Sequence, residues 1–137
     1  MTAEARFRIE VARLFSGKPM AVRRVAAVLR KSHGRFRRAD EVARHAGLRN
    51  RHELNTLLIN SRTASLSETS LIIRVLWWSI RWEEERVTLS QQASDESRYE
   101  SQLSREVVRA LGTPWSEVRQ QGTAWVVQQA RARLFRA

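Results

Sequence analysis

The segment 65–86 constrains the fold more than any other part of the chain. Its apolar residues, among them Leu71 and Trp77, lie on every side of a helix rather than along one stripe. A helix that is apolar all round is normally packed by neighbours on several of its sides. Ser65 and Glu68 have the spacing of a capping box, which marks the start of such a helix. We therefore predict a long central helix over this segment, surrounded by other helices.

The rest of the chain also shows helical periodicity, and no sustained alternation of apolar and polar residues predicts a strand. Phe7 and Val11 would lie on one face of a helix over residues 3–15. Pro19 suits the first turn of a helix over residues 19–32. The apolar fraction of 42% is enough to bury a core in a chain of 137 residues. We predict an all-α fold, a multi-helix bundle.

Residues 38–58 read RADEVARHAGLRNRHELNTLL and carry the signals of two helices joined by a tight turn. Asp40 suits the N-cap of a short helix, and Gly47 suits the left-handed residue that ends it. Asn50 and Glu53 have the spacing of a capping box, which predicts that a second helix begins at Asn50. This arrangement is a helix-turn-helix, whose second helix has the geometry needed to read a major groove.

The second helix of this motif would display hydrogen-bonding side chains outward while its leucines pack inward. Side chains near the start of such a helix reach the edges of bases. An ordinary helical hairpin with a solvated polar face would show the same pattern, so the motif alone leaves both interpretations open. The candidates for base reading are Arg49, Arg51, His52, Asn55 and Thr56.

The charge of the chain favours a polyanionic partner. Lys and Arg number 25 against 14 Asp and Glu, a net charge of +11, and residues 1–62 carry 15 of these cations and only 5 of the acids. Nearly all of the cations are Arg, the side chain best shaped for bidentate contact with phosphate or a guanine edge. A genome rich in Arg codons is the alternative explanation. The candidates for phosphate contact are Arg23, Arg24, Arg35, Arg37 and Arg38.

A second pair of short and long helices follows the central segment. Thr88 and Gln91 can cap a short helix. Ser97 and Glu100 have the spacing of a capping box for a longer helix, which Gly112 ends. This pair is a second helix-turn-helix-like unit, with outward-facing candidates for DNA contact. These candidates are Arg98, Tyr99, Gln102 and Arg105.

The order of these parts resembles the DNA-binding domain of AraC/XylS-type transcription regulators, in which a linker helix joins two helix-turn-helix units. GLRNRHELNTLL at residues 47–58 is similar to the family's first unit, and REVVRALGTPWSEVR at residues 105–119 is similar to its ending. The resemblance covers residues 19–119. It implies that both second helices insert into successive major-groove segments, here without the sensor domain that usually accompanies the module.

We expect sequence-specific binding of double-stranded DNA, typical of a transcription regulator, by two helix-turn-helix units joined by a long apolar linker helix. A basic helical adaptor for an acidic protein and a nucleic-acid-binding module without sequence preference, RNA binding included, are the alternatives. A protein partner or a homodimer is a further candidate. The expected parts are an N-terminal amphipathic helix (1–18), the first unit (19–64), the linker helix (65–86), the second unit (87–119) and a C-terminal helix (120–137).

Two features of the central segment could suggest other chemistry, and both have plainer interpretations. Helically spaced tryptophans, here Trp77, Trp78 and Trp82, belong to a core far more often than to a base-stacking platform. The acidic run 83–85 has no second cluster to complete a metal or acid–base site, so we expect a solvated helix end.

Nothing in the sequence predicts an enzyme, a cofactor or a metal site. The three histidines have no metal-binding spacing and the chain has no cysteine. No apolar run reaches the length of a transmembrane helix, and the first residues lack the apolar core of a signal peptide. We therefore expect a cytoplasmic, nucleoid-associated protein with no membrane contact.

Overall fold

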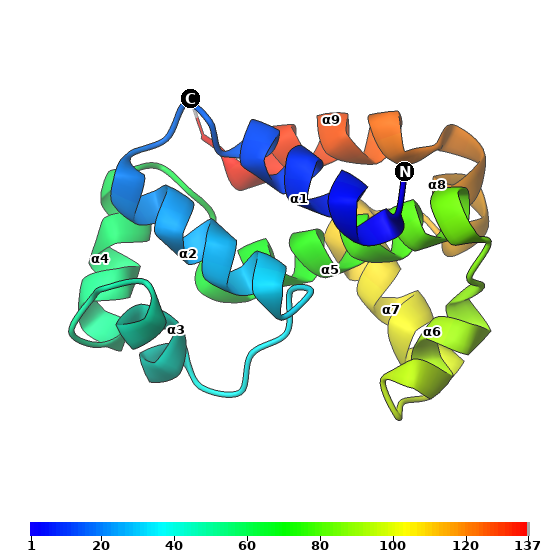
Figure 1. Cartoon of the computed structure of the whole chain (residues 1–137), viewed down its shortest axis with the longest axis horizontal. Coiled ribbons are helices and arrows are strands. Elements are labelled where there is room, and N and C mark those ends of the chain that lie inside the picture. The colour runs from blue at the N-terminus through cyan, green and yellow to red at the C-terminus, as the bar shows by residue number, and fades with distance from the viewer. Residues whose placement is uncertain (137) are drawn as a thin grey trace.

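The computed structural model describes residues 1–136, and its regular structure in this range is entirely α-helical. The all-α prediction is therefore confirmed, with a multi-helix bundle as the architecture (Figure 1). The helices are α1 (Ala3–Leu14), α2 (Met20–Lys31), α3 (Ala39–His45), α4 (Arg51–Asn60), α5 (Leu66–Glu85), α6 (Leu89–Asp95), α7 (Glu100–Leu111), α8 (Trp115–Gln121) and α9 (Thr123–Leu134).

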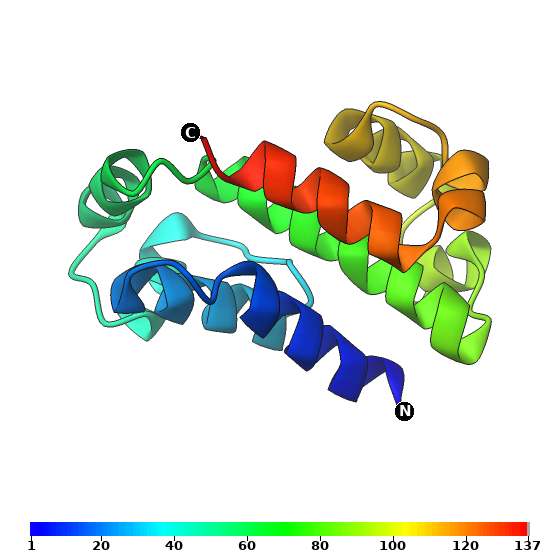
Figure 2. The ribbon, with the colours of Figure 1, turned by 90° about the horizontal axis from the view of Figure 1, so that it is seen from above.

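Helix α5 forms the centre of the bundle. It packs against α1, α7 and α9, and 12 of its 20 residues are buried. Figure 2 shows α9 running antiparallel along α5, and α1 packs beside both helices. Trp77 and Trp78 are buried, which confirms that they belong to the core. Trp82 is half-buried, and the guanidinium groups of Arg86 and Arg119 lie 5.1 and 4.9 Å from the centre of its ring.

Capping residues start several helices where the sequence predicts. The hydroxyl of Ser65 accepts a hydrogen bond from the backbone N–H of Glu68 at 3.2 Å, at the start of α5. The side chain of Asn50 accepts from the backbone N–H of Glu53 at 3.0 Å, at the start of α4. Each contact satisfies an N–H group that has no partner within its own helix.

The predicted N-cap at Asp40 is wrong, because α3 begins one residue earlier, at Ala39, and Arg38 precedes it. Asp40 lies within the first turn of α3, and its carboxylate accepts a hydrogen bond from the backbone N–H of Arg51 at 2.9 Å. That N–H is one of the groups that α4 leaves without a helical partner. Asp40 therefore links the starts of α3 and α4.

The predicted capping box of Ser97 and Glu100 is also wrong. Ser97 has a φ of +56°, a left-handed conformation that turns the chain after α6 and that an N-cap residue does not adopt. Helix α7 is preceded instead by Tyr99, whose backbone N–H donates to the side-chain oxygen of Gln102 at 2.9 Å. Gly112 ends α7 as predicted, with a φ of +73°.

The acidic run at the end of α5 is a junction rather than a solvated helix end. Arg6 of α1 donates hydrogen bonds to Glu83 at 2.9 Å and to Glu84 at 3.1 Å. Glu83 also accepts from the backbone N–H of Thr123, the first residue of α9. Burial raises the pKa of Glu83, but the hydrogen bonds from Thr123 and Arg6 outweigh it and hold the pKa below its ordinary value. The two carboxylates thus join α1 and α9 to α5.

Candidate nucleic-acid interface

Helices α3 and α4 form a compact pair that packs against α2. Ala43 of α3 and Leu54 of α4 are fully buried. Between the helices, Gly47 has a φ of +84°, a conformation that is strained for any residue with a Cβ atom. The backbone N–H of Leu48 then donates to the carbonyl of Ala43 at 2.8 Å, which closes the end of α3. Asp40 and Gly47 together fix the position and direction of α4 relative to α3.

The five base-reading candidates lie on the surface of α4 and of the turn before it, and each is exposed. Arg49 has a side-chain partner in the described structure: its side chain is 89% exposed, and its Nε lies 2.9 Å from the carboxylate of Glu53. Within residues 1–136, the other four side chains have no hydrogen bond or ion pair. They are Arg51, His52, Asn55 and Thr56.

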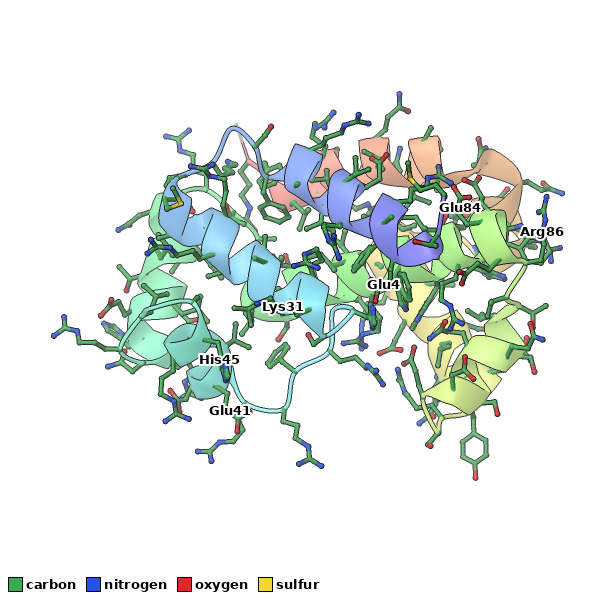
Figure 3. The ribbon with its side chains drawn as sticks, viewed as in Figure 1. Glu4, Lys31, Glu41, His45, Glu84 and Arg86 are labelled. Atoms are coloured by element: carbon green, nitrogen blue, oxygen red, sulfur yellow. The ribbon has the colours of Figure 1, made fainter. Side chains whose placement is uncertain are left out.

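The five phosphate candidates are likewise exposed, and none forms an ion pair within the described range. Arg35, Arg37 and Arg38 come from the loop between α2 and α3, which borders a hollow of about 360 Å³. Two further residues that border the same hollow, Lys31 and His45, are not among the phosphate candidates predicted from the sequence. Figure 3 shows Lys31 at the end of α2 and His45 on α3. Their exposure follows from helical periodicity, which was the signal that could have found them.

The four candidates of the second unit differ in their exposure. Tyr99 is 77% exposed and Arg105 is exposed. Gln102 is half-buried and accepts from the backbone of Tyr99. Arg98 is also half-buried and lies 2.7 Å from the carboxylate of Glu106 and 3.6 Å from that of Glu96. The predicted outward placement is therefore wrong for Arg98 and Gln102, because both are occupied within the fold.

Arg98 belongs to a buried charge cluster that sequence reasoning missed. Glu106 of α7 contacts both Arg74 of α5 and Arg98, and the side chains of the three are only 11–27% exposed. Burial lowers the pKa of Arg74, although Glu106 opposes this effect. Contact with Glu106 raises the pKa of Arg98. Arg74 is 32 residues from Glu106 in the sequence, so no local pattern signals the cluster.

Within residues 1–136, the His, Asp and Glu side chains do not gather in groups of three or more that could hold a metal ion. No helix within residues 1–136 has the length and apolar character needed to cross a membrane.

Comparison with known proteins gives no assignment: no family model matches the chain, and neither a curated protein nor a solved structure does. The resemblance to AraC/XylS-type domains therefore remains a prediction from the residues.

Proposed function

We propose that this protein binds double-stranded DNA in a sequence-specific manner and regulates transcription. In this proposal α3 and α4 are a helix-turn-helix unit, and α4 enters the major groove. The observation that carries the proposal is the row of exposed polar side chains on α4, four of which have no partner in the described part of the chain. Such side chains are free to bind base edges without first breaking a contact within the protein.

The distribution of charge supports the same surface. Residues 1–62 have a net charge of +10, from 15 Lys and Arg against 5 Asp and Glu, and the phosphate candidates all lie in this part. Phosphate contacts supply much of the affinity of DNA-binding proteins and set their orientation on the duplex. The first unit, residues 19–64, would therefore provide most of the affinity.

The remaining helices have supporting roles in this proposal. Helix α5 is the linker between the two units, and α6–α7 is a second helix-turn-helix-like unit. Of its candidates, only Tyr99 and Arg105 are fully available for contact. Residues 63–137 are also nearly neutral, with 10 Lys and Arg against 9 Asp and Glu. The second unit would thus contact DNA more weakly than the first.

We expect steeply salt-dependent binding of the full chain to a labelled duplex. Neutralising about five to eight phosphates gives a slope of roughly −4 to −7 when the logarithm of the association constant is plotted against that of the salt concentration. Fluorescence anisotropy between about 0.05 and 0.2 M salt measures this slope. A flat response, or no binding at the lowest salt concentration, would exclude DNA as the partner.

A further inference from the structure

An open hollow of about 770 Å³ lies where the loop between α2 and α3 passes over α5. Figure 1 shows this loop between the α3–α4 pair at one end of the molecule and the α6–α7 pair at the other. Cationic side chains from four segments line the hollow, and no carboxylate does so in the described structure. The cations are Lys31, Arg35, Arg37, Arg74 and Arg98.

The loop that carries two of these cations is held directly against α5. Gly34 has a φ of +84°, and a Cβ atom at this position would lie 2.7 Å from the backbone nitrogen of Arg74. The carbonyl of Gly34 also accepts a hydrogen bond from the guanidinium of Arg74 at 3.4 Å. Only a residue without a side chain allows this approach. The contact places Arg35 beside Arg74.

A second contact holds the start of the loop. The ring of His33 stacks on that of Trp77, with the ring centres 4.2 Å apart and an angle of 10° between the planes. A ring nitrogen of His33 lies 2.5 Å from the carboxylate of Glu4 in α1. The start of the loop is thus fixed at His33 and Gly34, which sets where the backbone passes over α5.

Only two of the five cations at the hollow, Arg74 and Arg98, are paired with carboxylates in the described structure. Lys31, Arg35 and Arg37 are exposed and have no ion pair within residues 1–136. Arg74 and Arg98 share the carboxylate of Glu106, and Arg98 also lies 3.6 Å from the carboxylate of Glu96. Burial is the largest effect on the pKa of Arg74 and lowers it, while the attraction of Glu106 raises it. The positive charges of Arg98 and Arg35 lower this pKa further. The like charges repel one another, and an anion among them would relieve that repulsion.

We propose that this hollow binds a phosphate group. Guanidinium groups match the oxygens of phosphate in bidentate geometry, and several cations from different segments can surround one such group. The inference rests on the proposed function, because the phosphate would come from the backbone of duplex DNA. It would belong to the DNA segment that lies between the segment facing α4 and the segment facing α7. Free phosphate or pyrophosphate has the same chemistry and is the other source.

The test compares two double variants with the same loss of charge. Arg35→Gln/Arg37→Gln removes two cations of the hollow. Arg13→Gln/Arg131→Gln removes two exposed cations of α1 and α9. Figure 1 shows these two helices on the side of the molecule away from the loop. All four side chains are exposed, so both variants should fold like the wild type.

We expect the hollow variant to bind duplex DNA about tenfold more weakly at 0.1 M salt, on every sequence alike, with a salt slope that is smaller by about 1. The control variant should lose less than about threefold, because its cations lie away from the duplex. Equal losses of duplex affinity in the two variants would overturn the phosphate site. The proposed function would still stand in that case, because the wild type binds the duplex.

Inorganic pyrophosphate separates the two sources of phosphate. If the wild type fails to bind duplex DNA, the proposed function is wrong, and the hollow is then judged by pyrophosphate alone. Chemical-shift changes of arginine Nε–H signals, seen in the wild type and absent in the hollow variant, would support a site for free phosphate. The absence of any response to both duplex DNA and pyrophosphate in the wild type would overturn the inference.

Discussion

Glu106→Gln is expected to lower the free energy of unfolding by about 2–4 kcal/mol. The carboxylate is 11% exposed and lies between the guanidinium groups of Arg74 and Arg98, which are 15% and 27% exposed. Removal of its charge leaves Arg74 without an ion pair and leaves Arg98 with only the more distant carboxylate of Glu96, at 3.6 Å. Breaking a fully buried ion pair costs about 3–5 kcal/mol, and the partial exposure of Arg98 reduces this cost. Urea unfolding at neutral pH, followed by circular dichroism, measures the change.

Glu85→Gln is the matched control for this prediction. Glu85 is exposed at the end of α5, and its carboxylate lies 3.7 Å from Arg81, so its loss should change the free energy of unfolding by less than about 0.5 kcal/mol. Addition of Arg98→Gln to Glu106→Gln should recover part of the loss, because one of the two facing cations is then gone. A stability of Glu106→Gln equal to that of the wild type would mean that the cluster does not fasten α7 to α5.

Arg51→Ala is expected to cost about 1–3 kcal/mol of binding free energy on the preferred duplex, or about 5- to 150-fold in affinity. Arg51 is exposed at the first position of α4, and the hydrogen bond from its backbone N–H to Asp40 fixes where its side chain starts. The side chains that reach base edges are those near the start of a recognition helix. The variant should also discriminate less between bases at one position of the preferred DNA sequence, and we expect that position to be a guanine.

Two other arginines serve as controls for Arg51. Arg105→Ala, on α7, should weaken binding at least several-fold less than Arg51→Ala, because residues 63–137 carry almost no net charge. Arg23→Ala, on α2, should weaken all sequences alike if this side chain contacts phosphate. A preferred motif that is unchanged in Arg51→Ala would show that Arg51 does not read a base. Equal losses of DNA affinity in Arg51→Ala and Arg105→Ala would indicate that the two units contribute equally to binding.

The helices could be predicted from the sequence because their signals are local. Capping pairs three residues apart, such as Ser65 with Glu68, act within one turn, and Gly47 needs only its own backbone to end α3. The central position of α5 could likewise be predicted from its own residues, which are apolar on every side of the helix. Exposure of Arg51 followed directly from the placement of α4.

The contacts between distant segments could not be predicted in the same way. Arg74 and Glu106 are 32 residues apart, and only the packing of α7 on α5 brings them together. The contact of Gly34 with Arg74 spans 40 residues, and the preference of glycine for turns does not reveal which backbone it approaches. A capping pattern also fails where two choices compete, as at Asp40, whose carboxylate binds the start of α4 instead of its own helix.

Selection of duplexes from a random pool by the full chain tests sequence-specific recognition by α4 most directly. The pool is incubated with the protein at about 0.15 M salt and an excess of bulk competitor DNA, and the retained duplexes are sequenced. We expect a short motif to be enriched, and the same selection with Arg51→Ala to lose the preference at one position of that motif. A retained pool that stays random would contradict sequence-specific recognition, and a chain that retains no duplex would contradict DNA binding altogether.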